Sequence, residues 1–268
     1  MQRPSWAPRG IDLDRPSAAR MYDYYLGGSH NFAIDRHAAE QAVAMWPDLP
    51  LIMQANRAFL RRAVRFLVAQ GITQFLDIGS GIPTVGNVYE VAQAADPGSR
   101  VVYVDIDPVA VAHSRAILAD NPGAAVVHGD ARDPERLLGQ EEVQRLLDLH
   151  QPVAVLMVAL LHFVPDDEDA SRLVRRLRDA VASGSYLAIS HASAEGRPAE
   201  SESHMQLYAQ TSTPMLMRSR RAIERFFDGL QLVEPGVVYL PVWRPESPDD
   251  VDEHPERFTG FAGVGRKE

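Results

Sequence analysis

Short apolar runs alternate with amphipathic stretches through the middle of the chain. The apolar runs lie at 73–78, 100–105, 125–128, 153–158 and 185–190. Each is short enough for a buried strand, and the stretches between them favour helices. Strands and helices in regular alternation predict a parallel sheet with helices on both faces.

Helix start signals support this alternation. Asp107-Pro108 and Asp133-Pro134 each place a capping acid before a proline, and proline suits the first position of a helix. Asp166-Asp167 begins a further predicted helix that runs to about Val181.

The pattern before the first strand is purely helical. Residues 1–15 lack periodicity and predict a loose arm. Helices are predicted at Pro16–Leu26, Asp35–Trp46 and Leu51–Gln70, and Gly71 ends the last of them.

The pattern after the fifth strand changes again. Apolar residues at 230–233 and 237–242 flank Glu234-Pro235-Gly236. This spacing predicts a hairpin, so the last strand is expected to run antiparallel to the sheet. The segment from 244 onward is rich in Pro, Asp and Glu and predicts a surface tail. We therefore divide the chain into an N-terminal arm and helical cap (1–71), a sheet domain (72–243) and a tail (244–268).

Composition and charge narrow the class of protein. The 268 residues are 46% hydrophobic and 24% charged, as in soluble globular proteins. The net charge of −9 argues against a broad phosphate-binding surface, so no nucleic-acid partner is expected. With no cysteine there is no thiolate site, and the histidines lack the spacing of metal ligands. No apolar run approaches the roughly 18 residues of a membrane span, and the N-terminus does not resemble a signal peptide, so a cytoplasmic protein is expected.

The strongest chemical signal follows the first predicted strand. The apolar run ends in Asp77, and Gly79 and Gly81 come directly after it. This order predicts a buried strand, a tight turn and a helix N-terminus, where the backbone can approach a nucleotide-like ligand. A pyrophosphate needs free N–H groups at such a turn. The carboxylate of Asp77 instead suits a ligand with a positive or donor-rich part.

Acidic residues also end the next two strands. Asp105 ends the second strand and can accept both hydroxyls of a ribose, and helix capping does not explain it because Asp107 is the cap. Asp130 follows the third strand; it can accept from an adenine amino group or be a turn residue. Since the carboxyl ends of parallel strands meet at the ligand-binding edge, the three acids fit an adenosine without phosphates.

These positions resemble the class I S-adenosylmethionine-dependent methyltransferases over roughly residues 72–243. The resemblance rests on Asp77-Ile78-Gly79-Ser80-Gly81, Asp105, Gly129-Asp130 and Leu160–Asp166. Ala19–Gly28, Asn56–Leu60 and Val242–Pro245 are similar to an uncharacterised actinobacterial methyltransferase-like family, which extends the resemblance to nearly the whole chain.

The resemblance implies an α/β fold with S-adenosyl-L-methionine as cofactor. The fold is a Rossmann-like, doubly wound sheet of seven mostly parallel strands in the order 3-2-1-4-5-7-6, with the last strand antiparallel and an N-terminal helical extension. The implied roles are the methionine part along the backbone of Gly79, Ser80 and Gly81, its ammonium at Asp77, the ribose at Asp105, the adenine at Ile106, Asp130 and the N–H of Ala131, and the sulfonium beside Ala159 and Leu160.

One position departs from the common pattern. Class I enzymes commonly carry a third glycine where this chain has Pro83. The loop can still form, because proline fits the first turn of the helix expected there. The same departure, with Thr84 at the next position, disfavours a nicotinamide dinucleotide, whose fingerprint has Gly or Ala there.

Two further groups of residues have two interpretations each. His162 follows the fourth strand and can act as a catalytic base, since an ordinary histidine pKa is near ~6.5, or it can order its loop. Tyr22, Tyr25, Gly27 and Gly28 can form a lid over the cofactor, or the two tyrosines can belong to the core of a packing helix. The acceptor pocket is expected from the N-terminal helices and residues 191–218, where Glu195, Glu200, His204, Tyr208 and Met215 lie.

The sequence thus predicts a methyltransferase acting on a small molecule by in-line transfer to an O, N or C nucleophile. Two alternatives remain at this point. One is a module that binds S-adenosylmethionine or S-adenosylhomocysteine without turnover, and the other is an NAD(P)-dependent oxidoreductase. The identity of the acceptor and the oligomeric state are not predicted.

Overall fold

The computed structural model describes residue 8, residues 11–83 and residues 86–268. The predicted loose arm lies mostly outside the described residues, and Thr84 also lies outside them. None of the described helices combines the length and the apolar character needed to cross a membrane.

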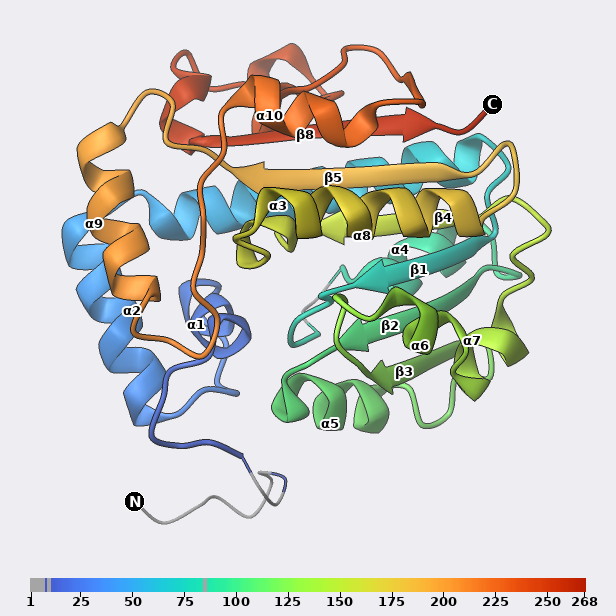
Figure 1. Cartoon of the computed structure of the whole chain (residues 1–268), viewed down its shortest axis with the longest axis horizontal. Coiled ribbons are helices and arrows are strands. Elements are labelled where there is room, and N and C mark those ends of the chain that lie inside the picture. Colours follow the sequence, from blue (N-terminus) through green and yellow to red (C-terminus); the bar gives the residue numbers. More distant parts are fainter. Residues whose placement is uncertain (1–7, 9–10, 84–85) are drawn as a thin grey trace.

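The strands form a single mixed sheet, whose strands follow one another from β8 at the top to β3 at the bottom of Figure 1. Its order is β3-β2-β1-β4-β5-β8-β6, and β7 also pairs with β8. β1 to β5 run parallel, and β8 is antiparallel to β5. The predicted strand order with a reversed strand is therefore confirmed. The strands are β1 (Gln74–Ile78), β2 (Arg100–Asp105), β3 (Ala124–His128), β4 (Ala154–Val158), β5 (Tyr186–Ala192), β6 (Gln231–Leu232), β7 (Val238–Tyr239) and β8 (Gly260–Arg266).

The reversed strand is not where the sequence pattern predicts it. Residues 260–266 form β8, which pairs with β5 over its whole length, so the prediction of a surface tail is wrong for this segment. The predicted hairpin is also wrong, because β6 and β7 lie one after the other along β8 and pair with it. The strand is not predicted from the sequence because it contains three glycines, Gly260, Gly263 and Gly265, which are uncommon in strands. At Gly263 and Gly265 an added Cβ would lie 2.9–3.1 Å from the ring of Phe227, so these positions must be small for the sheet to receive that side chain.

Ten α-helices and five 3-10 helices accompany the sheet in the described part of the chain. The predicted caps are confirmed, because the side chains of Asp107, Asp133 and Asp166 accept backbone N–H groups of α5, α6 and α8. The helices are α1 (Ala18–Tyr25), α2 (Ala33–Met45), α3 (Leu49–Ala69), α4 (Val88–Ala95), α5 (Pro108–Ile117), α6 (Pro134–Leu138), α7 (Glu141–Leu146), α8 (Asp167–Ala180), α9 (Pro198–Tyr208), α10 (Arg220–Glu224), η1 (Leu161–Phe163), η2 (Arg225–Phe227), η3 (Leu240–Val242), η4 (Pro248–Asp250) and η5 (Pro255–Phe258).

The loop after β1 is longer than the sequence suggests. Asn87 caps α4 by accepting the N–H of Glu90, so the helix starts at Val88. The prediction that a helix begins directly after Gly81, with Pro83 in its first turn, is therefore wrong. Ile82, which would precede a helix that starts at Pro83, has no side-chain acceptor, whereas the side chain of Asn87 accepts the N–H of Glu90.

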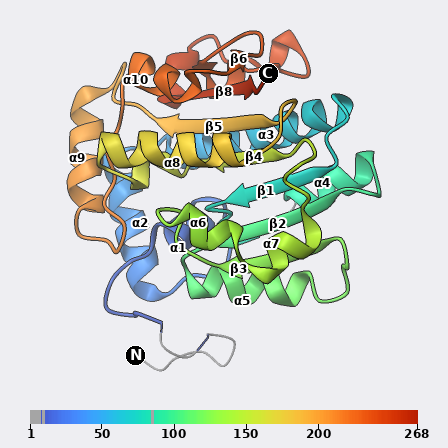
Figure 2. The ribbon, with the colours of Figure 1, turned by 45° about the vertical axis from the view of Figure 1, so that its right-hand side comes forward.

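Two apolar layers cover the two faces of the sheet. Along β1, Phe75 packs with α3 and α4, whereas Leu76 and Ile78 pack with α7 and α8 on the other face. Figures 1 and 2 show α6, α7, α8 and α10 on one side of the sheet and α3 and α4 on the other. Because side chains alternate along a strand, Asp77 shares the α3 face with Phe75.

Helices α1, α2 and α9 lie beyond the carboxyl ends of the parallel strands (Figure 1). They come from the two distant parts of the chain before β1 and after β5. This placement covers the edge at which ligands bind to parallel sheets.

The close packing of Phe227 and Leu230 against Gly265 allows the position of β8 to be tested. An alanine Cβ at Gly265 would lie 2.9 Å from Phe227 and 3.0 Å from Leu230. We expect Gly265→Ala to lower the free energy of unfolding by about 1–3 kcal/mol, because overpacking a core forces its side chains to shift. Urea denaturation measures this change. As a control, Gly139→Ala should change stability by less than about 0.5 kcal/mol, since its nearest neighbour is at an ordinary 3.4 Å. Equal effects of the two substitutions would contradict the packing of β8.

Candidate functional site

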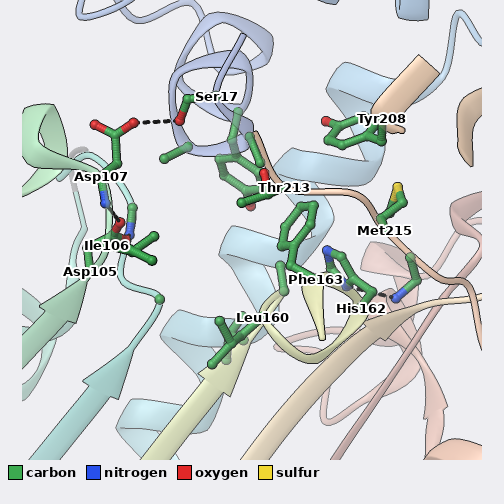
Figure 3. Close-up of a pocket in the computed structure, with 18 of the residues that line it drawn as sticks. Ser17, Asp105, Ile106, Asp107, Leu160, His162, Phe163, Tyr208, Thr213 and Met215 are labelled. Carbon is green, nitrogen blue, oxygen red and sulfur yellow. Dashed lines mark hydrogen bonds between the residues drawn. The ribbon is translucent and has the colours of Figure 1, made fainter. Parts of the chain in front are cut away.

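A cavity of about 490 Å³ lies at the carboxyl ends of the parallel strands. The loops after β1, β2, β3 and β4 line the cavity together with residues of α1, α3, α9 and the loop after α9. Figure 3 shows Asp105 and Ile106, which follow β2, on one side, and His162 and Phe163, which follow β4, on the other side with Tyr208 and Met215.

The backbone N–H groups of the loop after β1 donate hydrogen bonds to other residues of the protein. Gly79 N and Ser80 N both donate to Val104 O, at 2.8 and 3.1 Å. Gly81 N donates to the carboxylate of Asp105 at 2.7 Å. Gly79 and Gly81 have φ of 73° and 67°, which favours glycine. The three N–H groups that a phosphate would need are therefore already occupied.

Asp105 holds two loops together. Its Oδ2 accepts from Gly81 N, and its Oδ1 accepts from Asp107 N at 2.8 Å. The side chain is buried, and burial raises the pKa of Asp105 to about 6, while the hydrogen bonds from Asp107 and Gly81 oppose the rise. Each carboxylate oxygen can accept more than one hydrogen bond, so Asp105 has capacity left for hydroxyl groups of a ligand.

Asp77 and Arg57 bring opposite charges to the same cavity. Burial raises the pKa of Asp77 to about 7, and the nearby charge of Arg57 opposes this rise. Among the described residues the Asp77 carboxylate has no hydrogen-bond donor, and Nε and Nη2 of Arg57 are buried without an acceptor. Unpaired buried polar groups are costly, so this pair suits a ligand that carries both a cation and an anion.

Sequence reasoning missed Arg57 as a site residue. It lies on α3, beside Asn56 and between the buried apolar residues Ile52 and Phe59. Two polar residues inside the apolar stretch of a packed helix are the signal that could have identified it. That signal acquires its meaning only when α3 packs on the face of the sheet that carries Asp77.

The loop after β3 lines the cavity, and its acidic residue, Asp130, is paired with Arg132. Asp130 and Ala131 line the cavity together with Ile106, which is 48% exposed. Both oxygens of Asp130 accept from the guanidinium of Arg132 at 2.6–3.0 Å, and these hydrogen bonds lower the pKa of Asp130. A ligand amino group at Asp130 would share these oxygens with Arg132.

Strain occurs in the loop after β4. Ala159 has φ of 57°, an unusual value for a residue with a Cβ, and such backbone costs of order 1–3 kcal/mol. Its N–H donates to Ser190 Oγ at 2.9 Å, and Ser190 Oγ donates to Asn56 Oδ1 at 2.6 Å. Asn56 Nδ2 donates to the hydroxyl of Tyr22 at 2.9 Å. This chain of hydrogen bonds joins Ala159, which lines the cavity beside Leu160, to α1.

His162 lines the cavity as a neutral ring. Burial lowers the pKa of His162 well below its usual value, and His191, His204 and Arg218 add to this effect. Its Nδ1 accepts from Ala192 N at 3.4 Å, so the proton of the neutral ring belongs on Nε2. His191 is fully engaged, since Nδ1 donates to Ala192 O and Nε2 accepts from Arg218.

The N-terminal segment is anchored over the cavity. Ser17 Oγ donates to Asp107 at 2.5 Å, and Ser17 N donates to Asp35. Arg20 forms a buried ion pair with Asp35. Ser212 N donates to Pro16 O at 3.1 Å, which joins this segment to the loop after α9. The lining residues of this cover lie between Asp12 and Tyr22.

Most of the predicted site residues line this cavity. The exceptions are Tyr25, Gly27 and Gly28; an added Cβ at Gly28 would collide with Asp23, so this turn is required by local packing. Of the candidates between β5 and β6, Glu195 and Glu200 also lie outside and contact arginines. The predicted residues that line the cavity are Tyr22, Asp77, Gly79, Ser80, Gly81, Asp105, Ile106, Asp130, Ala131, Ala159, Leu160, His162, His204, Tyr208 and Met215.

Comparison with known proteins identifies the family. The profile of a family described as S-adenosyl methyltransferase matches residues 4–268. A Thermobifida fusca protein assigned as a methyltransferase by inference is 43% identical, with a TM-score of 0.93 over 99% of this chain and 100% of that one. A DUF574 family protein from Streptomyces avermitilis is 42% identical, with a TM-score of 0.92 over 96% and 100% of the two chains. The N-methyltransferase NodS from Bradyrhizobium japonicum shares the fold at 13% identity, with a TM-score of 0.50 over 82% and 98%. No curated protein matches the chain. The chain belongs to the S-adenosyl methyltransferase family.

Proposed function

We propose that this protein transfers the methyl group of S-adenosyl-L-methionine to an oxygen, nitrogen or carbon nucleophile of a small molecule. The family supplies the cofactor and the reaction type. The cavity of about 490 Å³ would have to hold the cofactor and the acceptor together, which supports a small acceptor, since small-molecule pockets span about 300–1,000 Å³. The hydrogen bond from Ser212 N to Pro16 O joins the loop after α9, which lines the cavity, to the N-terminal segment.

The occupied N–H groups of the loop after β1 carry the proposal for the cofactor site. Gly79, Ser80 and Gly81 donate to Val104 and Asp105, so they offer no cradle for a pyrophosphate. An adenosyl group without phosphates has no need of one. This geometry supports S-adenosylmethionine against a nicotinamide dinucleotide.

The residues around the cavity fit the parts of S-adenosylmethionine. Asp105 would accept the ribose hydroxyls, and Asp77 and Arg57 would hold the ammonium and the carboxylate of the methionine part. Arg57 is suited to a carboxylate because its guanidinium can donate two parallel hydrogen bonds. The remaining roles are the methionine chain along Gly79, Ser80 and Gly81, the adenine at Ile106, Asp130 and Ala131, and the sulfonium beside Ala159 and Leu160.

Catalysis of this reaction depends more on the alignment of the two reactants than on a strong base. When bound, the cofactor supplies a methyl group on a sulfonium, so its S–C bond breaks as the new bond to the acceptor forms, and the acceptor proton passes to water. The chain holds the two reactants in line and keeps bulk water out. His162 presents a hydrogen-bond donor at Nε2, which suits orientation of the acceptor better than removal of its proton.

Binding of S-adenosylhomocysteine tests the role of Asp105. We expect Asp105→Asn to weaken binding at least about tenfold, because hydrogen bonds to a charged group contribute about 1.5–3 kcal/mol. Titration calorimetry on the purified protein measures the Kd. Asp133→Asn is the control, since Asp133 also follows β3 but caps α6 outside the cavity. Unchanged affinity in Asp105→Asn would remove this residue from the site.

Arg57 can be tested with a truncated ligand. Arg57→Gln should weaken S-adenosylhomocysteine binding at least about tenfold, through loss of a charged hydrogen bond to the carboxylate. The affinity for 5′-methylthioadenosine, which lacks the amino acid part, should stay the same. Arg65→Gln on the same helix is the control, because Arg65 is solvent-exposed and bound to Glu246. Equal losses for both ligands would place Arg57 elsewhere than at the carboxylate.

The raised pKa of Asp77 predicts two pH effects. The Kd for S-adenosylhomocysteine should rise roughly tenfold from pH 8 to pH 6, because the carboxylate must be ionised to hold the ammonium, and Asp77→Asn should remove most of this slope.

In the cofactor-free protein the folded-state pKa of Asp77 lies above the unfolded value of about 3.9, so the stability contributed by this group falls as the pH rises from about 4 to about 7. Asp77→Asn should therefore raise the Tm at pH 8 and leave it nearly unchanged at pH 4. A lower Tm at pH 8 would contradict the cost of the buried charge.

A further inference from the structure

The cavity follows the carboxyl ends of the parallel strands from β3 as far as the start of β8. Asp130 and Ala131 line it after β3, and Thr259 and Gly260 line it at the start of β8. The proposed cofactor residues of the sheet follow β1, β2, β3 and β4, so the positions beside β5 and β8 remain for the methyl acceptor. The sequence pattern assigns residue 259 to a surface tail, and only the pairing of β8 with β5 brings it to the cavity.

Thr259 has a strained backbone. Its φ of 40° and ψ of 29° lie in the left-handed region, where a residue branched at Cβ is an outlier. The residue follows η5, and a turn at the end of a helix is usually made by glycine or asparagine, which adopt this conformation more easily. Because the turn alone does not require threonine, the strain points to a role of the side chain.

Backbone hydrogen bonds fix Thr259 against the end of β5. Its carbonyl oxygen accepts from Ser193 N at 2.9 Å. Gly260, the next residue, pairs with Ala192 in the ladder between β5 and β8. Ala192 N also donates to Nδ1 of His162. Thr259 and His162 are therefore both held at the last residues of β5.

The side chains of Thr259 and His162 present polar atoms to the cavity. Both residues are almost fully buried, with exposures of 4% and 6%. Thr259 Oγ1 and His162 Nε2 have no hydrogen-bond partner among the described residues, and neither belongs to the unpaired polar atoms that the protein encloses completely. Since both residues line the cavity, the surface that these two atoms keep lies toward it.

Thr213 shows that a threonine beside the cavity need not offer its hydroxyl. It lines the same cavity, but its Oγ1 is completely enclosed. The two threonines therefore form a matched pair, in which only Thr259 can bind a ligand through its hydroxyl.

We propose that Thr259 is an acceptor-binding residue that determines specificity, and that its hydroxyl and the Nε2–H of His162 hydrogen-bond to an oxygen atom of the methyl acceptor. The inference rests on the proposed methyltransferase function and adds a residue outside the cofactor site. A hydroxyl group can donate or accept, and Nε2–H donates, so an oxygen with two lone pairs can pair with both groups. An acceptor with an apolar group at this place would leave both polar groups unpaired.

A probe attached to the cofactor tests this contact without a known acceptor. In stable analogues of S-adenosylmethionine a tertiary nitrogen replaces the sulfonium sulfur, and a chain on that nitrogen points where the methyl group would go. Two series with chains of increasing length are compared, one ending in a hydroxyl group and the other in a methyl group at the same place. At each length, titration calorimetry gives the ratio of the Kd of the methyl-ended analogue to that of the hydroxyl-ended analogue.

We expect Thr259→Val to lower this Kd ratio about three- to tenfold at the chain length that favours the hydroxyl group most, because the variant keeps the shape of the side chain and removes one neutral hydrogen bond. Thr259→Ser keeps the hydroxyl and should retain the ratio. Thr213→Val is the matched control and should leave the ratio unchanged. A ratio that Thr259→Val does not lower at any chain length, or an equal fall in Thr213→Val, would overturn the inference.

Stability separates a binding role of the hydroxyl from a structural one. Thr259→Val should leave the Tm of the ligand-free protein nearly unchanged, since Oγ1 has no partner in the described chain, whereas loss of a structural hydrogen bond would lower it. The Kd for S-adenosylhomocysteine should also stay the same.

The two levels of proposal fail separately. No binding of S-adenosylhomocysteine to the unmodified protein would contradict the proposed function. Normal binding of S-adenosylhomocysteine with an unchanged Kd ratio in Thr259→Val would contradict only the role of Thr259.

Discussion

The carboxylate of Asp105 is the interaction on which the site depends. One oxygen holds the loop after β1 through Gly81 N, and the other holds the start of α5 through Asp107 N. Asp107 in turn receives Ser17, so the N-terminal cover is attached to the same point. Three segments that are far apart in the chain thus take their positions from two buried carboxylates at the end of β2, those of Asp105 and Asp107. The same carboxylate would accept the ribose, so cofactor binding and loop geometry depend on one group.

Burial of unpaired charge is the second constraint. Asp77 and Arg57 face one cavity without hydrogen bonds to each other or to another described residue. This arrangement costs stability in the cofactor-free protein, because burial removes both charges from water and their mutual attraction offsets only part of that cost. A ligand with an ammonium and a carboxylate would satisfy both. Active sites commonly retain such costs, since the groups that bind a ligand cannot also be satisfied by the protein.

The strained backbone at Ala159 is supported from a distance. Ser190 on β5 and Asn56 on α3 form the hydrogen bonds that hold its N–H, and Asn56 also binds Tyr22 of the N-terminal cover. The residue beside the proposed reaction centre is therefore coupled to the sheet, to a packed helix and to the cover. Phe163, Tyr208 and Met215 line the same cavity across from Asp105 and Ile106, so an aromatic and thioether wall faces the acids at the strand ends.

Local patterns were enough to establish the frame of this protein. The alternation of apolar runs placed β1 to β5 within two residues, and the acids before Pro108 and Pro134 identified two helix starts, because these signals act between near neighbours in the chain. Acids at the ends of β1 and β2 pointed to the cavity, since parallel strands bring their carboxyl ends together. The tertiary structure decided what depends on distant partners. β8 forms because β5 and Phe227 offer a place for a glycine-rich strand, and Arg57 becomes a site residue because α3 packs on the face that carries Asp77. The neutral state of His162 likewise follows from burial and from Ala192, neither of which a sequence pattern records.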